Sequence, residues 1–303
     1  TPLPVVNYTN KHGTALIDFV ASNNSLNNEL QELTRRTFQG VLGQPGVEPA
    51  KNCLILEKEG RISGFAIVFH EYPINRSIIE VMAAPSLVGG TEELELIRQA
   101  VTVAKSELPS VVHMCVSPDT GRGKLLRKLG FTQVRTYLDM LWSEESLPEA
   151  DLPAKYSLRS FHEEDSALLT KIQNDAFAGS WGFCPNTDEQ IKYRTRMPNT
   201  SKTGILFLLD GGLPAGYCWT LMVPSENGLR GAIGMIGVMP DYRGQGVSRH
   251  ILHAGMRYLH SIGISEVGLE VDGNNAAAIR LYTSTGFKKI GERHWFELDL
   301  PGK

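Results

Sequence analysis

Apolar and polar positions in the second half of the chain follow the two periods that distinguish strands from helices. Short apolar runs bounded by glycine or proline predict buried strands, and apolar residues that recur every three or four positions predict amphipathic helices. By these criteria we expect strands at 156–161, 205–210, 215–223, 232–240 and 266–271, and helices at 164–177, 247–263 and 275–286. This order predicts an α/β fold in which a mixed sheet is covered by helices.

The first half of the chain repeats part of this pattern. Residues 60–69 predict a strand that follows a tight turn. Gly64 in this pattern corresponds to Gly216, which lies 152 residues later. Phe131, which ends a Leu-Gly-Phe sequence, corresponds to Phe287, which lies 156 residues later. Because the two offsets agree closely, we interpret the chain as a tandem duplication of one α/β unit.

The segment 143–155 separates the two copies. It concentrates acidic residues and two prolines between more apolar regions, which is typical of a solvated connection between domains. We therefore expect two domains, at 1–145 and 154–303. The chain has 303 residues, of which 42% are hydrophobic, so each domain can bury a core of its own.

Composition and charge exclude several classes of partner. The 33 acidic residues nearly balance the 30 basic residues, and the net charge is −3, so no overall field attracts nucleic acid or an anionic membrane. No stretch approaches the roughly 20 apolar residues that a membrane-spanning helix needs. We expect a cytoplasmic protein that holds any bound anion by local contacts.

The cysteines and histidines do not predict a metal site. The four cysteines are Cys53, Cys115, Cys184 and Cys218. They form no Cys-x-x-Cys pair, and no histidine follows them at the spacing of a zinc site. His250 and His253 lie one helical turn apart, but no third ligand is spaced to join them. We therefore expect no metal cofactor.

Residues 238–248, Val-Met-Pro-Asp-Tyr-Arg-Gly-Gln-Gly-Val-Ser, are the most informative segment. They connect a predicted strand to a predicted helix, and the unpaired N–H groups at a helix start favour a bound anion. Gly244 and Gly246 let a phosphate approach the main chain, and Arg243 adds a positive charge. The segment matches neither a Walker loop nor the Gly-x-Gly-x-x-Gly loop of dinucleotide-binding proteins. The candidate anion-binding residues are Arg243, Gly244, Gln245, Gly246, Val247 and Ser248.

A second motif follows in the helix predicted at 275–286. Its defining residues are Asn275, Ala278, Leu281, Tyr282, Gly286 and Phe287. Together with Arg243 and Gly246 they resemble the signature of the GNAT superfamily of acetyl-CoA-dependent N-acetyltransferases. That signature is a Gln/Arg-x-x-Gly-x-Gly/Ala loop followed by an Asn-x-x-Ala-x-x-Leu-Tyr-x-x-x-Gly-Phe helix. Ser248 departs from it, because glycine or alanine is usual there. The resemblance covers nearly all of residues 154–303.

The resemblance implies how the cofactor binds. Acetyl-CoA would lay its diphosphate on the amides of residues 244–248. Its pantetheine arm would extend along the edge of the preceding strand, where main-chain groups of Val238 and Met239 could pair with it. The thioester would then lie where two parallel strands part, near Asn275 and Tyr282.

The resemblance also implies an acetyl or short acyl transfer by direct attack of an amine in a ternary complex. Tyr282 is the candidate proton donor to the departing thiolate, although a packed aromatic residue would fit the same position. We expect the acceptor to be a small-molecule amine rather than a protein. Trp181, Phe183 and Trp219 are candidates to line its pocket, with a place in the core as the alternative.

The base is not assigned by the sequence. Related enzymes often carry a glutamate on the strand before the loop, but no acid lies at 232–238. Glu226, Glu270 and Glu297 are the candidate substitutes, with a solvated or structural charge as the alternative for each. A water chain or an already neutral amine would also serve. An inactive acyl-CoA-binding or regulatory module is the alternative function, and the missing strand carboxylate and Ser248 favour it.

The first domain departs from the family pattern. Residues 81–99 stand where the loop belongs and contain no Gln/Arg-x-x-Gly-x-Gly/Ala sequence, and Leu126 replaces the tyrosine of the helix motif. We therefore expect a degenerate copy that is structural or shapes the acceptor site, with weak residual cofactor binding as the open alternative. The tandem arrangement itself resembles that of two-domain members of the family.

Overall fold

The computed structural model describes residues 4–22, 26–149 and 151–300. These residues form two compact units that do not coincide with linear halves of the chain. Unit 1 comprises the residues up to Leu138, Asp272–Asn274 and the residues from Glu292 onward. Unit 2 comprises Asp139–Val271 and Asn275–Gly291. The linear boundaries at 145 and 154 therefore differ from those of the units, because each unit includes a segment from the other repeat.

The exchanged segments are the last strands of the two repeats. Strand β6 (Thr132–Trp142) enters unit 2 at Asp139, and strand β12 (Lys288–Asp299) enters unit 1 at Glu292. In unit 1, β12 pairs antiparallel with β5 (Val111–Val116). The exchange extends to the packed interiors, because Phe296 of β12 lies in the core of unit 1.

Unit 1 has the strand order β1-β2-β3-β4-β5-β12, in which β4 and β5 are parallel and the other described pairs are antiparallel. Its further strands are β1 (Val5–Asn7), β2 (Cys53–Lys58), β3 (Arg61–Glu71) and β4 (Arg76–Ala83). Its helices are α1 (Gly13–Ser22), α2 (Asn28–Leu42), α3 (Pro49–Asn52), α4 (Thr91–Ser106) and α5 (Arg122–Lys128). The strand predicted at 60–69 is confirmed as β3.

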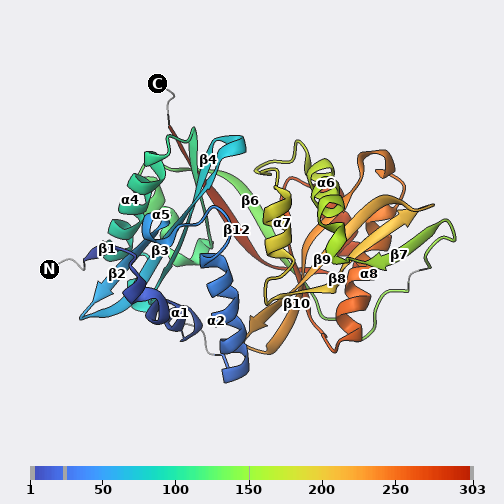
Figure 1. Cartoon of the computed structure of the whole chain (residues 1–303), viewed down its shortest axis with the longest axis horizontal. Coiled ribbons are helices and arrows are strands. Elements are labelled where there is room, and N and C mark those ends of the chain that lie inside the picture. Colours follow the sequence, from blue (N-terminus) through green and yellow to red (C-terminus); the bar gives the residue numbers. More distant parts are fainter. Residues whose placement is uncertain (1–3, 23–25, 150, 301–303) are drawn as a thin grey trace. The chain divides into compact units, whose positions relative to one another are not determined.

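Helices cover both faces of the unit 1 sheet. Along β2, Leu54 and Leu56 pack with residues of α4 and α5, whereas Cys53 and Ile55 pack with residues of α1 and α2. Successive side chains of a strand point to opposite faces, so these two clusters form separate cores above and below one sheet. Figure 1 shows the helices arranged about this sheet.

Unit 2 has the strand order β6-β11-β10-β9-β8-β7. Its strands are β7 (Tyr156–Ser160), β8 (Thr200–Asp210), β9 (Leu213–Ser225), β10 (Gly228–Val238) and β11 (Val267–Asp272). Its helices are α6 (Ser166–Phe177), α7 (Asp188–Arg194), α8 (Val247–Ser261) and α9 (Ala276–Thr285). The predicted strands and helices of this half are confirmed, although β8 begins five residues earlier and a 3-10 turn at Glu163–Asp165 precedes α6. The mixed α/β architecture is confirmed as well.

The unit 2 sheet is also covered on both faces. Tyr217 and Trp219 of β9 pack in one core with residues of α6 and α7. Cys218 and Thr220 point to the opposite face, where both approach Gly255 of α8. No helix in the described part of the chain is both long enough and apolar enough to cross a bilayer.

Candidate functional site

The centre of unit 2 contains two parallel strands that part. Strands β10 and β11 are in register only at Gly231 and Ala232, although β10 continues to Val238. The pairing of β10 with β9 shifts register between Ile233 and Met235, directly after this short parallel pairing. Beyond it, the edge of β10 that faces β11 is not paired in the ladder. An opening between parallel strands at this end is a typical place for a ligand in an α/β sheet.

The segment that follows β10 forms a turn with a row of unpaired amides. A 3-10 turn at Pro240–Tyr242 leads to Gly244 and Gly246, whose φ angles are 76° and 79°. Both values lie in the left-handed region that favours glycine, and a Cβ atom at either position would meet nothing within 4 Å. In the described part of the chain, the amides of residues 244–248 donate no hydrogen bond. Five successive donors at the start of α8 fit a bound diphosphate.

Two side chains of the turn hold it in place from within. Arg243 donates from Nη2 to the carbonyl oxygen of Ala176, 2.9 Å away, in the last turn of α6. Gln245 donates from Nε2 to the carbonyl oxygen of Asp241. Both side chains are exposed, so the guanidinium charge remains at the surface of the turn while it satisfies a helix-terminal carbonyl.

The end of β10 offers Val238 rather than Met239 to an extended ligand. The N–H of Met239 donates to the carbonyl oxygen of Ala215, and its carbonyl oxygen accepts from the N–H of Tyr242. Because main-chain groups of successive strand residues point to opposite edges, those of Val238 point toward the opening. Val247, also expected at the cofactor, is buried beside Gly216, so its main chain is the part that can contact a ligand.

Helix α9 begins and ends as its motif predicts. The Oδ1 atom of Asn275 accepts from the N–H of Ala278 at 3.1 Å, which caps the helix. At the other end, Gly286 adopts a φ of 107°, and the N–H of Phe287 donates to the carbonyl oxygen of Tyr282. Asn275 itself is exposed, so its cap role is compatible with a ligand contact.

Tyr282 is buried on α9, with its ring centroid 5.9 Å from that of Phe287. Burial raises the pKa of Tyr282, and the nearby Cys218 thiol contributes in the same direction. Cys218 belongs to β9, so the side chain of Tyr282 lies close enough to β9 for the two groups to interact. Its hydroxyl has no hydrogen-bond partner among the described residues. A tyrosine in this state carries its proton well above neutral pH.

The three candidate acids lie in different surroundings. Glu297 is in unit 1, where its Oε2 atom lies 2.7 Å from Nε2 of His113. Glu226 is exposed in the turn between β9 and β10. Glu270 is exposed on β11, on the face opposite the buried Leu269, and it lies beyond the short pairing of β11 with β10. Of the three, Glu270 is the one beside the opening.

The candidate acceptor-lining aromatics divide into two groups. Phe183 stacks on Phe177 at 5.4 Å in the segment between α6 and α7, where Trp181 is also half-buried. Trp219 is a core residue instead, with Nε1 donating to Oγ1 of Thr200 at 2.6 Å. The segment between α6 and α7 is therefore the part of this set that can contact an acceptor.

The two histidines of α8 lie in different surroundings. His250 lies with its ring 6.0 Å from that of Tyr156. His253 is buried, and neither ring nitrogen has a partner among the described residues. Burial, together with the neighbouring arginines, lowers the pKa of His253. Within the described ranges, no group of three or more His, Cys, Asp or Glu side chains is placed to hold a metal ion.

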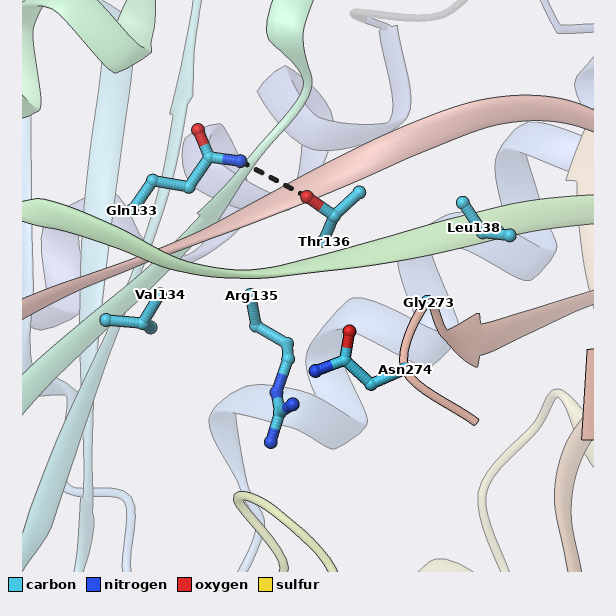
Figure 2. Close-up of a pocket in the computed structure, with 7 residues that line it drawn as sticks. All are labelled: Gln133, Val134, Arg135, Thr136, Leu138, Gly273 and Asn274. Atoms are coloured by element: carbon cyan, nitrogen blue, oxygen red, sulfur yellow. Dashed lines mark hydrogen bonds between the residues drawn. The ribbon is translucent and has the colours of Figure 1, made fainter. Parts of the chain in front are cut away.

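An open groove of about 580 Å³ lies in unit 1 and shares no residue with the segments above. It is lined by Gln133, Val134, Arg135, Thr136, Leu138, Gly273 and Asn274. Figure 2 shows the side chains of Arg135 and Asn274 on one side of β6, while Gln133 donates to Thr136. Its mouth is wide and polar, which is unlike the concave and largely apolar site typical of a small-molecule ligand.

Sequence reasoning missed two contacts of the site. The carbonyl oxygen that Arg243 contacts belongs to Ala176, 67 residues away, and no local signal pairs them. The thiol of Cys218 lies near Tyr282, and an alternating strand pattern does not show which helix residue will reach it. Gly216, Gly237 and Gly255 are a partial signal of close packing in the sequence. At each of them a Cβ atom would lie closer than 3 Å to a neighbouring atom.

Comparisons with known proteins agree with this arrangement. Residues 166–287 match the model of the Acetyltransferase (GNAT) family. A mycothiol acetyltransferase of Tsukamurella paurometabola is 30% identical over 232 residues, which span 71% of this chain and 76% of that protein. A mycothiol acetyltransferase of Nocardia farcinica is 26% identical over 258 residues, 81% of each chain.

Solved structures show the same fold along the whole chain. A GCN5-related N-acetyltransferase from Sphaerobacter thermophilus has a TM-score of 0.72 at 18% identity, covering 99% of this chain and 97% of its own. A tandem GNAT protein from the clavulanic acid biosynthesis pathway has a TM-score of 0.71 at 14% identity, covering 99% and 100%. The chain therefore belongs to the GNAT family of N-acetyltransferases, in its tandem two-domain form.

Proposed function

We propose that unit 2 transfers an acetyl group from acetyl-CoA to a small-molecule amine, by direct attack while both substrates are bound. Members of this family use acetyl-CoA as the acyl donor. The observation that carries the proposal is the row of unpaired amides at residues 244–248, which provides a place for a diphosphate next to the opening between β10 and β11. No other described turn in unit 2 combines these two features.

In this proposal, the turn binds the diphosphate of the cofactor and the edge of β10 binds its pantetheine arm. The amides of residues 244–248 hold the diphosphate, and the exposed guanidinium of Arg243 adds a positive charge beside it. Val238 offers its main-chain groups to the amides of the pantetheine arm, so that the arm adds to the open edge of β10. Asn275 lies at the start of α9, at the far side of the same opening.

In this proposal, side chains that border the opening carry out the two proton transfers of the reaction. Acetyl-CoA supplies the activated acetyl thioester. Tyr282 keeps its hydroxyl proton because burial raises its pKa, so it can supply a proton to the departing sulfur. We propose Glu270, which is exposed on β11 beyond its pairing with β10, as the carboxylate that accepts a proton from the amine, directly or through water. The Cys218 thiol takes no part, since burial raises its pKa to about 12 and keeps it protonated.

The acceptor is proposed from the relatives. Both curated relatives described above are mycothiol acetyltransferases, so we propose that the acceptor is a small molecule related to mycothiol. The half-buried Trp181 and Phe183 supply apolar surface for it in the segment between α6 and α7.

The test is an assay of thiol release with acetyl-CoA and a panel of small amines, including mycothiol-type compounds. We expect coenzyme A release that depends on the acceptor and saturates with it. A reaction without acceptor is the control for thioester hydrolysis. Saturable binding of acetyl-CoA with no acceptor-dependent release across the panel would instead show an inactive binding module.

A further inference from the structure

Unit 1 contains a strand-turn-helix segment whose first part resembles the proposed cofactor turn of unit 2. Residues 83–91 connect β4 to α4, and residues 238–247 connect β10 to α8, with one residue more. In each, a 3-10 turn beginning with proline follows the strand. In each, the second residue after that turn is a glycine with a φ of 76°, Gly89 and Gly244. The preceding strand is paired in parallel with its neighbour in both units.

The turn of unit 1 donates a hydrogen bond to the side chain of Glu93. Glu93 is the third residue of α4, and its side chain has no exposed surface. Its Oε2 atom accepts from the N–H of Gly89 at 2.7 Å. Its Oε1 atom lies 2.8 Å from Nε and 2.7 Å from Nη2 of Arg122. A buried carboxylate is costly unless it is paired and hydrogen-bonded, and here both conditions are met.

At the corresponding position, unit 2 has an exposed basic side chain instead of a buried carboxylate. The third residue of α8 is Arg249, which is exposed and donates to Oγ of Ser284. The described residues of unit 2 offer no acceptor to the amides of 244–248. The two turns therefore share the proline-led 3-10 turn and a left-handed glycine, but their helix caps differ, with a φ of −90° at Gly90 and 79° at Gly246. They also differ in charge, because the turn of unit 1 has its own carboxylate and the turn of unit 2 has only donors.

We propose that the Glu93 carboxylate takes the place of the cofactor diphosphate in unit 1, and that this unit is closed to coenzyme A by its own side chain. Arg122 fixes the carboxylate there. One chain then binds a single molecule of coenzyme A, in unit 2. The inference rests on the proposed function only in taking the turn of unit 2 as the cofactor site.

The direct test removes the Glu93 carboxylate by mutation and then supplies acetate in solution to replace it. Glu93→Ala leaves Arg122 and the N–H of Gly89 without their anion, and we expect the melting temperature to fall by about 10 °C. Sodium acetate should restore at least half of that loss, relative to sodium chloride of equal ionic strength. Glu95→Ala is the matched control, because Glu95 lies on the same helix and pairs with Arg98 at the surface. It should show neither the large loss nor the rescue.

Absence of any acetate-specific shift in Glu93→Ala would overturn the proposal. Should that variant fail to fold, the wild-type chain provides the decision. Native mass spectrometry with saturating coenzyme A should show one molecule bound to each wild-type chain. Two bound molecules would overturn this inference and leave the proposed function standing. A count of zero would overturn the proposed function and this inference together.

Discussion

Two buried side chains near the opening between β10 and β11, those of Tyr282 and Cys218, carry a proton at neutral pH. Burial raises the pKa of both groups, which keeps the proton on each. The thiol faces Gly255 of α8, where a Cβ atom would lie only 2.5 Å from the sulfur, so it has no access to a ligand. The tyrosine hydroxyl has no partner among the described residues, and we therefore propose it as the acid.

Tyr282→Phe should separate chemistry from binding. Phenylalanine keeps the ring that packs beside Phe287 but removes the hydroxyl proton. We expect kcat to fall by about 10² to 10⁴, while the Kd for acetyl-CoA changes by less than about twofold. Because the pKa of Tyr282 is raised above 10, the wild-type rate should show no loss of this acid as pH rises to 9. Steady-state kinetics and calorimetric titration provide the two measurements.

Tyr217→Phe is the matched control for this change. Its hydroxyl is also buried without a partner, but it lies on the opposite face of the sheet in the core with α6. Removing an unpaired buried hydroxyl costs little, so we expect kcat and stability close to those of the wild type. A parallel fall of kcat and cofactor affinity in Tyr282→Phe would show that Tyr282 packs rather than reacts.

At the scale of elements, the exchange of last strands ties the stability of each unit to residues of the other repeat. Phe296 follows the family motif in the sequence, yet it is 1% exposed in the core of unit 1, with the Arg127 guanidinium over its ring. We expect Phe296→Ala to destabilise unit 1 by about 3 to 5 kcal/mol. Amide hydrogen exchange should therefore accelerate on β5, which pairs with β12, more than on β8 and β9.

Phe207→Ala gives the opposite pattern and serves as the control. Phe207 lies on β8, is fully buried and belongs to the core of unit 2. Its loss should accelerate exchange on β8 and β9 more than on β5. Faster exchange on β8 and β9 in Phe296→Ala would contradict the assignment of β12 to unit 1.

Most elements of unit 2 could be predicted from the sequence because their signals are local. The stripe of α8, the cap at Asn275 and the glycines of the 244–248 turn each depend on neighbours within a few residues. The exchange of β6 and β12 could not be predicted, because an alternating strand pattern does not identify its partner strand. The same limit applies to Met239, whose main chain is satisfied by Ala215 across the sheet.

At the scale of the whole molecule, the tandem repeat keeps one architecture and changes one interaction. Both units place helices on both faces of a sheet, and both have a proline-led turn before a helix. In unit 1 the Glu93 carboxylate accepts from the N–H of Gly89, whereas in unit 2 the amides of residues 244–248 are unpaired among the described residues. The sequence showed the loss of the family loop at 81–99. The carboxylate that we propose in place of the ligand could be identified only from the structure, because its partner Arg122 lies 29 residues from Glu93.

The central claim is that the amides of residues 244–248 bind the cofactor. Calorimetric titration of acetyl-CoA into Gly246→Val tests it most directly, because valine is strained at a φ of 79° and adds bulk where a phosphate would approach. Gly263→Val is the matched control, at the other end of α8, with a φ of 88° and equally open space. We predict affinity at least about tenfold weaker in Gly246→Val and close to wild type in Gly263→Val. Wild-type affinity in Gly246→Val would contradict the account.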